Sequence, residues 1–384
     1  MKNQRRVVQA IGLCLMAPAM FFATSCNSGG ESNRNSEDSV TAAPADTASA
    51  QKLKDLKPTG AKPDWGPSIT DNMLVVIEKL QSLNGKPIET LTAPEARKQP
   101  TPTQAVMEVM KDNGISMPPA MVDTSGKDIP VKGGSIHARI YTPRISKDKY
   151  PIIVYYHGGG WVIADLDTYD ASPKGLAEQT GAVVVSVHYR QGPEHKFPTA
   201  HNDAFAAYEW VLKNAAEIKG DTSKIAVAGE SAGGNLACNV SIMARDKKIR
   251  MPLHQVLIYP VANNDMNSES YKKYAMAKPL NKPMMAWFAK NYLPSMGASS
   301  DKRFSIVKAD LKNLPPTTII AAEIDPLQTE GKQLSEQLDK AGVKTDYKLY
   351  DGVTHEFYGM ATVLPEAKEA QKKASDAIKD SFEK

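Results

Sequence analysis

The stretch that decides the fold is Lys224-Ile225-Ala226-Val227-Ala228-Gly229-Glu230-Ser231-Ala232-Gly233-Gly234. Residues 225–228 form a short apolar run of the kind that fills a buried parallel strand. Residues 229–233 fit the pattern G-x-S-x-G, and residues 235–244 are predicted to form a helix. A sharp turn from strand to helix leaves no room for a Cβ at the two flanking positions, which explains both glycines.

Such a turn makes Ser231 a candidate nucleophile. It lifts the hydroxyl off the backbone and places it at a helix N-terminus, where partial positive charge favours a developing oxyanion. A five-residue pattern also occurs by chance, so a glycine-rich turn with a helix-capping serine is the alternative for this stretch in isolation. The strand before it and the helix after it favour the nucleophile.

Composition predicts a globular chain with an exported N-terminus. The 384 residues are 41% hydrophobic and 23% charged, enough for one large α/β domain with an accessory cap or for two ordinary domains. Basic residues near the start and an apolar stretch at residues 7–23 predict a signal peptide over residues 1–25. Removing it takes three of the 47 basic residues and leaves 44 against 43 acidic ones, so no nucleic-acid surface is expected.

The cysteines predict a lipid anchor rather than a disulfide or a metal site. Cys26 follows Ala23-Thr24-Ser25, which resembles a bacterial lipobox with Ala23 in place of the usual Leu. We therefore expect a periplasmic or cell-envelope lipoprotein attached to a membrane through lipidated Cys26, the alternative being an ordinary signal peptide cleaved nearby. Residues 26–63 are polar and predict a disordered tether. Cys238 is expected in the core, and no C-x-x-C pair suggests a metal.

The order of elements predicts an α/β fold with a mainly parallel central sheet and helices on both faces. Residues 129–131 and 136–141 predict a hairpin, and the further strands are expected at residues 152–156, 182–187, 225–228, 253–259, 317–322 and 345–349. Helices are expected between them and at residues 366–382, so the core domain is placed at residues 126–384. Two amphipathic helices within residues 64–125 and an insertion at residues 263–314 are expected to cap the site.

A serine nucleophile needs a base, an acid behind the base, and donors for the oxyanion. After an elbow of this kind the acid and then the histidine are expected along the chain. His355 lies in a loop between a strand and the last helix and is the candidate base, whereas His254 is expected to be a packed or rim side chain. Asp325 follows the strand at residues 317–322 and is the candidate acid. Strand alternation points Glu323 the same way, so Glu323 remains the competitor.

A glycine loop after an early strand supplies candidate oxyanion donors. His157-Gly158-Gly159-Gly160-Trp161 follows the strand at residues 152–156, and three glycines let the backbone approach a ligand closely. We expect the donors to be the N–H groups of Gly158, Gly159 and Ala232, with His157 orienting the loop. No phosphate-binding pattern accompanies these glycines, and no cofactor is expected.

Five motifs in order resemble the hormone-sensitive-lipase-like esterases (bacterial esterase family IV) of the α/β-hydrolase superfamily. They are HGGGW (157–161), YRQGPEHKFP (189–198), GESAGG (229–234), DPL (325–327) and HEF (355–357). The resemblance spans about residues 131–382. It implies that Ser231 is the nucleophile, Asp325 the acid and His355 the base, with the same oxyanion donors. It also implies a cap made from the N-terminal segment and the insertion.

Several positions differ from that family, and none touches the implied triad. His188 stands where an Asp usually precedes the Tyr-Arg pair, Ala164 replaces a usual Gly, and residues 328–329 replace a commonly charged pair. These differences concern ion pairs around Arg190 and the range of substrates. Glu230, next to the nucleophile, is expected to be a structural hydrogen-bonding residue.

The sequence therefore predicts a serine carboxylic-ester hydrolase for short- to medium-chain acyl esters, working through an acyl-enzyme on small-molecule substrates. An amidase or a carbohydrate deacetylase would use the same triad, so these alternatives stay open. A non-catalytic lipoprotein that binds ligands on this fold would need a broken triad or a blocked elbow.

Overall fold

The computed structural model describes residues 51–384, and the predicted signal peptide and Cys26 lie outside these residues. Eight strands form one sheet in the order β1-β2-β4-β3-β5-β6-β7-β8. They are β1 (Val122–Val131), β2 (Gly134–Pro143), β3 (Tyr150–Tyr156), β4 (Val183–His188), β5 (Gly220–Glu230), β6 (Gln255–Ile258), β7 (Thr317–Ile324) and β8 (Thr345–Thr354). β2 is antiparallel to both of its neighbours, and the pairs from β4 to β8 are parallel, which confirms the predicted mainly parallel sheet.

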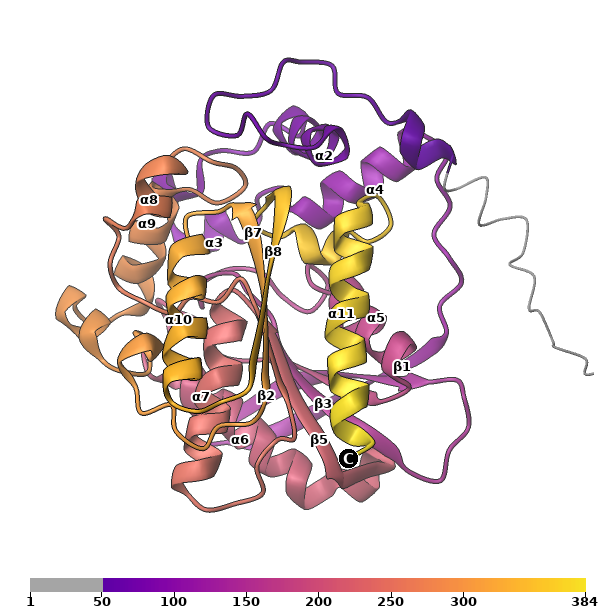
Figure 1. Ribbon diagram of the computed structural model, residues 1–384, viewed down its shortest axis with the longest axis vertical. Helices are drawn as coiled ribbons and strands as arrows, with labels where there is room; N and C mark the ends of the chain where they lie inside the picture. Colours follow the sequence, from indigo (N-terminus) through magenta and orange to yellow (C-terminus); the bar gives the residue numbers. More distant parts are fainter. Residues whose placement is uncertain (1–50) are drawn as a thin grey trace, which may run out of the picture. The chain divides into compact units, whose positions relative to one another are not determined.

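The central strands are apolar along their whole length because helices cover both faces of the sheet. α5 and α11 lie on one face, and α6, α7 and α10 lie on the other (Figure 1). Their bounds are α5 (Ala171–Thr180), α6 (Thr199–Asn214), α7 (Ala232–Asp246), α10 (Gln328–Lys340) and α11 (Pro365–Phe382), with the short helix η2 (Ala215–Ile218) after α6. Each face has its own hydrophobic core, so the sheet separates two layers of helices.

Two further groups of short helices lie near the carboxyl ends of the strands (Figure 1). The N-terminal group is α2 (Asp71–Ser82), η1 (Ile88–Thr90), α3 (Ala93–Ala96) and α4 (Pro102–Asp112). The second group interrupts the chain between β6 and β7 and consists of α8 (Glu269–Lys273), α9 (Lys282–Tyr292), η3 (Met296–Ser300) and η4 (Ile306–Lys308). The last short helix, η5 (Phe357–Met360), joins β8 to α11.

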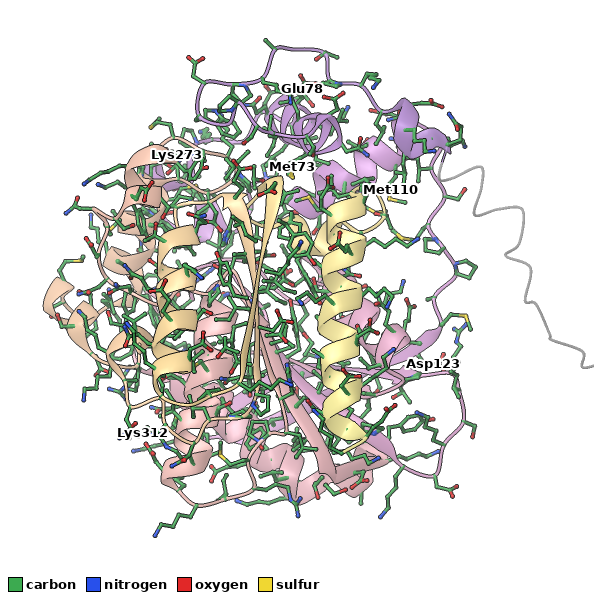
Figure 2. The ribbon with its side chains drawn as sticks, viewed as in Figure 1. Met73, Glu78, Met110, Asp123, Lys273 and Lys312 are labelled. Atoms are coloured by element: carbon green, nitrogen blue, oxygen red, sulfur yellow. The ribbon has the colours of Figure 1, made fainter. Side chains whose placement is uncertain are left out.

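The N-terminal helices are fastened to the rest of the fold by packing and by polar contacts. α2 packs against α4, and Met73 of α2 lies over the ends of β7 and β8 (Figure 2). The Met73 sulfur accepts a hydrogen bond from the hydroxyl of Thr354 at 3.6 Å. Trp287 of α9 donates its indole N–H to the carbonyl of Leu91 at 2.9 Å, which ties the two groups of short helices together.

Two boundaries differ from the sequence prediction. Residues 51–63, expected in the tether, contact the fold: residues 51–55 are helical and Leu56 is 2% exposed. The Glu78 carboxylate of α2 accepts the N–H groups of Thr59 and Gly60. The polar composition of residues 51–63 does not predict these contacts. The sheet also begins at Val122 instead of residue 126, because the hairpin is longer than its apolar residues suggest. Within residues 51–384, no helix combines the length and apolar character required to cross a membrane.

Candidate active site

Ser231 occupies a tight turn between β5 and α7. Its φ is +55°, a left-handed conformation that a residue with a side chain adopts only where the surroundings impose it. A Cβ at Gly233 would lie 1.9 Å from the carbonyl oxygen of Tyr156, and one at Gly229 would lie 2.2 Å from the carbonyl oxygen of Gly233. The glycine argument from the sequence is therefore confirmed: any larger residue at either position would collide with backbone.

Asp325 and His355 meet because the sheet register brings their strands together. Ile324 of β7 pairs with Thr354 of β8, and each candidate residue directly follows one member of that pair. The Nδ1 of His355 lies 2.7 Å from an Asp325 carboxylate oxygen, and both side chains are buried. The other Asp325 oxygen accepts the backbone N–H of Leu327 at 2.9 Å. Burial lowers the pKa of His355, but the Asp325 carboxylate, together with those of Glu356 and Glu230, outweighs burial, so that pKa is raised above its ordinary value.

Glu323, the competing acid, has a different set of contacts. One of its carboxylate oxygens accepts the hydroxyl of Ser68 at 2.8 Å and the other accepts the N–H of Gly352 at 2.7 Å. The pairing of β7 with β8 shifts register between Ala322 and Ile324, so simple alternation does not describe this stretch. Glu323 therefore links the N-terminal segment to the end of β8, and Asp325 alone of the two contacts the histidine.

The glycine loop follows β3 and lies beside the elbow, since Tyr156 of β3 pairs with Gly229 of β5. In residues 51–384 the N–H groups of Gly158 and Gly159 donate to no other protein group. Each glycine is closely covered: a Cβ at Gly158 would lie 2.2 Å from the hydroxyl oxygen of Tyr169. At Gly159 a Cβ would meet the carbonyl oxygen of Ile163 at the same distance. The loop thus presents unpaired donors where side chains would not fit.

A cavity of about 580 Å³ lies beside this group of residues. Gly159, Ser231 and His355 lie in its wall, and the short helices supply much of the remainder. The large apolar side chains that the short helices and their connections contribute to that wall include Ile77, Leu80, Ile88, Met276, Leu280, Met284, Met285 and Phe288. Phe288 of α9 packs so closely on the loop that a Cβ at Gly160 would lie 2.3 Å from its ring. The elements expected to form a cap therefore enclose the cavity beside Ser231.

Comparison with known proteins gives the family. A family model described as an alpha/beta hydrolase fold matches residues 153–359. Carboxylesterase NlhH of Mycobacterium tuberculosis is 38% identical over 256 residues, 66% of this chain and 78% of that protein. The ethyl acetate hydrolase of Pseudomonas putida is 31% identical over 288 residues, 74% of this chain and 88% of that protein. A solved esterase of Pyrobaculum calidifontis is similar with a TM-score of 0.71 and 38% identity, covering 78% of this chain and 97% of that chain.

The chain belongs to the hormone-sensitive-lipase-like esterases of the α/β-hydrolase superfamily. It is thus an enzyme with carboxylesterase activity, and the resemblance drawn from its motifs is confirmed. The alternative of a non-catalytic binding protein is excluded.

Two histidines of the esterase hold its glycine loop. His157 is fully buried, with Nδ1 2.9 Å from the carbonyl oxygen of Gly158 and its ring stacked on Tyr189 at 4.4 Å between centroids. Burial lowers the pKa of His157 to about 3, so it stays neutral and holds the loop. His188, which differs from the family pattern, lies with Nδ1 3.2 Å from Nε2 of His157.

Although His188 replaces the usual Asp, Arg190 of the esterase still has a carboxylate partner. Arg190 binds the buried Asp203 of α6 in a bidentate ion pair, with the closest nitrogen and oxygen 2.6 Å apart. Such fork-to-carboxylate pairs fix geometry as well as charge. The residue before Tyr189 is therefore not needed as the partner of this arginine.

Glu230, next to Ser231 in the esterase, is a structural hydrogen-bonding residue, as expected. Its two carboxylate oxygens accept hydrogen bonds from the hydroxyls of Tyr155 and Tyr259. Burial raises the pKa of Glu230 to about 7. The ring of Tyr259 also packs on His355, with centroids 4.5 Å apart, so this buried cluster supports the histidine from behind.

Glu356 and Tyr169, to which the sequence pattern assigned no role, both border the cavity of the esterase. An oxygen of Glu356 lies 3.8 Å from Nε2 of His355 and accepts the Tyr169 hydroxyl at 2.6 Å. Glu356 has φ +71°, again a left-handed conformation for a residue with a side chain. Its place directly after His355 was the one available signal, whereas Tyr169 is 187 residues away and carried none.

Proposed function

We propose that this esterase hydrolyses carboxylic esters through an acyl-enzyme on Ser231, with His355 as base and Asp325 as acid. The observation that carries the proposal is the buried 2.7 Å contact between Asp325 and His355 at the edge of a cavity that Ser231 also borders. A serine hydroxyl is a weak nucleophile at neutral pH, so it needs a base that is held in one tautomer. The Asp325 contact supplies that constraint.

The reaction follows from these roles. Asp325 accepts the Nδ1–H of His355, which leaves Nε2 free to take the proton of Ser231 as its Oγ attacks the ester carbonyl. The imidazolium that forms then gives this proton to the departing alcohol, and Asp325 stabilises the positive charge. Water hydrolyses the acyl-enzyme by the same proton transfers in reverse.

We assign the oxyanion hole to the N–H groups of Gly158, Gly159 and Ala232. Two observations support this assignment: the loop N–H groups have no partner among residues 51–384, and Ser231 is the N-cap of α7, whose first helical residue is Ala232. Preorganised donors of this kind stabilise the tetrahedral intermediate without a reorganisation cost at the moment of reaction.

The cavity supports short- to medium-chain acyl esters as substrates. Its volume of about 580 Å³ lies within the range of roughly 300–1,000 Å³ that small-molecule sites span. Its apolar wall suits a hydrocarbon chain, and the close contact of Phe288 with Gly160 limits the space beside the loop. The relative in Pseudomonas putida is named for ethyl acetate, an ester with a two-carbon acyl group.

The test is Ser231→Ala with a matched control on the same helix. Ser241 is a buried serine of α7 whose hydroxyl bonds the Ala237 carbonyl and which does not border the cavity, so Ser241→Ala is the control. We expect Ser231→Ala to lower kcat for 4-nitrophenyl butyrate by about 10³-fold or more and to abolish labelling by a fluorophosphonate. Wild-type turnover in that variant would show that Ser231 is not the nucleophile. An ester panel with matched anilides measures chain length and ester preference.

We also propose that the protein is exported and anchored through lipidated Cys26. The basic and apolar pattern of residues 1–25 and the lipobox-like residues before Cys26 support this proposal. In a bacterial host, metabolic labelling with a fatty-acid analogue should mark the wild type and not Cys26→Ala. Equal labelling of both proteins would refute anchoring at this cysteine.

A further inference from the structure

The imidazole of His355 lies between two carboxylates. Its Nδ1 contacts Asp325, while its Nε2, the nitrogen that exchanges protons with reactants, lies 3.8 Å from an oxygen of Glu356. A separation of 3.8 Å is too long for a direct hydrogen bond. A water molecule that makes hydrogen bonds of about 2.8 Å to both atoms spans a gap of this size.

The carboxylate of Glu356 is held in this place from two sides. Its backbone is in the left-handed region, and strain of this kind persists where surrounding contacts impose it, often at functional sites. The Tyr169 hydroxyl donates to the same oxygen that faces Nε2. That hydroxyl in turn lies against the glycine loop at Gly158. The side chain is 21% exposed and borders the cavity, so small molecules reach it.

Water and alcohols differ in what they need at this position. When either attacks the acyl-enzyme, one O–H points at Nε2 of His355 and gives up its proton. Water has a second O–H, which loses a hydrogen bond in an enclosed site unless an acceptor stands nearby. An alcohol has a carbon in that place and needs no acceptor. The Glu356 oxygen next to Nε2 provides an acceptor that only water uses.

We propose that Glu356 is a positioning residue that orients the hydrolytic water and favours water over alcohols as acyl acceptor. The proposal rests on the acyl-enzyme at Ser231. The water oxygen bonds to the acyl carbon, one proton passes to Nε2, and the other stays on oxygen and points to Glu356. The bond from the acyl carbon to Ser231 Oγ then breaks, Oγ regains the proton from Nε2, and the carboxylic acid leaves.

The experiment measures how the acyl-enzyme partitions. Wild type, Glu356→Ala and Glu356→Gln are incubated with 4-nitrophenyl butyrate and increasing methanol, and methyl butyrate and butyric acid are quantified by gas chromatography. We expect Glu356→Ala to raise the ratio of ester to acid about tenfold, which corresponds to about 1.4 kcal/mol. That is near the lower end for a hydrogen bond to a charged group. Glu356→Gln should stay within about twofold of wild type, because the Tyr169 hydroxyl keeps an amide oxygen in place.

The ratio separates this role from a purely structural one. Both products arise from one acyl-enzyme with one base, so the amount of folded protein, the acylation rate and the pKa of His355 affect both alike. Glu89→Ala, which removes another carboxylate from the cavity wall, should leave the ratio at the wild-type value. An unchanged ratio in Glu356→Ala, or an equal rise in Glu356→Gln or Glu89→Ala, would overturn the proposal. If the fluorophosphonate does not label Ser231 in the wild type, the acyl-enzyme itself is refuted instead.

Discussion

Replacing Asp325 by Asn tests the assignment of the acid, and the structure dictates how the amide must orient. One Asp325 oxygen accepts the backbone N–H of Leu327 at 2.9 Å, and the other lies 2.7 Å from Nδ1 of His355. In Asp325→Asn the amide oxygen must stay on the Leu327 N–H, since an amide nitrogen there would face another donor. The NH₂ group then points at Nδ1, which has to become an acceptor. The histidine proton moves to Nε2, and the base cannot take the proton of Ser231.

The size of the effect follows from this change of tautomer. A Ser-His-Asp site with the wrong tautomer loses roughly 10⁴-fold in kcat while its geometry is kept. That loss equals about 5.5 kcal/mol of activation free energy. The shape of the side chain hardly changes and the bond to Leu327 survives, so we expect the variant to fold.

The assay compares Asp325→Asn with Glu323→Gln, which is the matched control two residues away. In Glu323→Gln the amide oxygen can accept the N–H of Gly352 while its NH₂ donates to the hydroxyl of Ser68, so both contacts survive. Initial rates with 4-nitrophenyl butyrate give kcat, and thermal unfolding checks the fold. The reasoning is wrong if Asp325→Asn keeps more than about a tenth of wild-type kcat, or if Glu323→Gln loses as much as Asp325→Asn.

Three more outcomes follow from the same geometry. Burial lowers the pKa of His355, but Asp325, Glu356 and Glu230 together raise it above 6.5, so kcat/KM should rise with pH through a midpoint above that value; a midpoint below it would contradict the argument that these carboxylates outweigh burial. Gly352→Ala places a Cβ 2.7 Å from a Thr70 methyl carbon on a residue with φ +68°, so it should lower the free energy of unfolding by roughly 1–3 kcal/mol. Urea titrations measure this change, and an unchanged midpoint would show that the N-terminal segment moves away without cost. Phe288→Ala should raise kcat/KM for decanoate relative to butyrate esters several-fold by enlarging the cavity, whereas an unchanged ratio would place the acyl chain elsewhere.

Several features of the candidate site could be predicted from the sequence because they are local. A G-x-S-x-G pattern between an apolar run and a helix specifies a strained turn by steric exclusion alone, and the collisions at Gly229 and Gly233 are the ones expected. Parallel strands end at a common edge, so residues that directly follow predicted strands were expected to meet. Asp325 and His355 were placed in this way.

The contacts of the segment before α2 could not be predicted from its own composition. Residues 51–63 are polar in composition and were assigned to a tether, yet Leu56 is buried and the backbone near Thr59 is bound by Glu78. Their order depends on acceptors supplied by a helix later in the chain. The composition of a segment indicates how much apolar surface that segment can bury by itself. It does not indicate which hydrogen-bond acceptors another segment supplies.

The sequence by itself determined the fold class, the nucleophile elbow, the candidate base and the glycine loop, because strand period, turn sterics and the order of motifs are encoded by neighbouring residues. Strand alternation did not separate Glu323 from Asp325, although the motifs implied Asp325 as the acid. Only the tertiary structure shows which of the two contacts His355, and only it placed Glu356 against the free nitrogen of His355. The first decision depends on a register shift between two strands, and the second on a hydroxyl from Tyr169, 187 residues away. Such contacts arise from packing between distant segments, which periodicity along the chain does not specify.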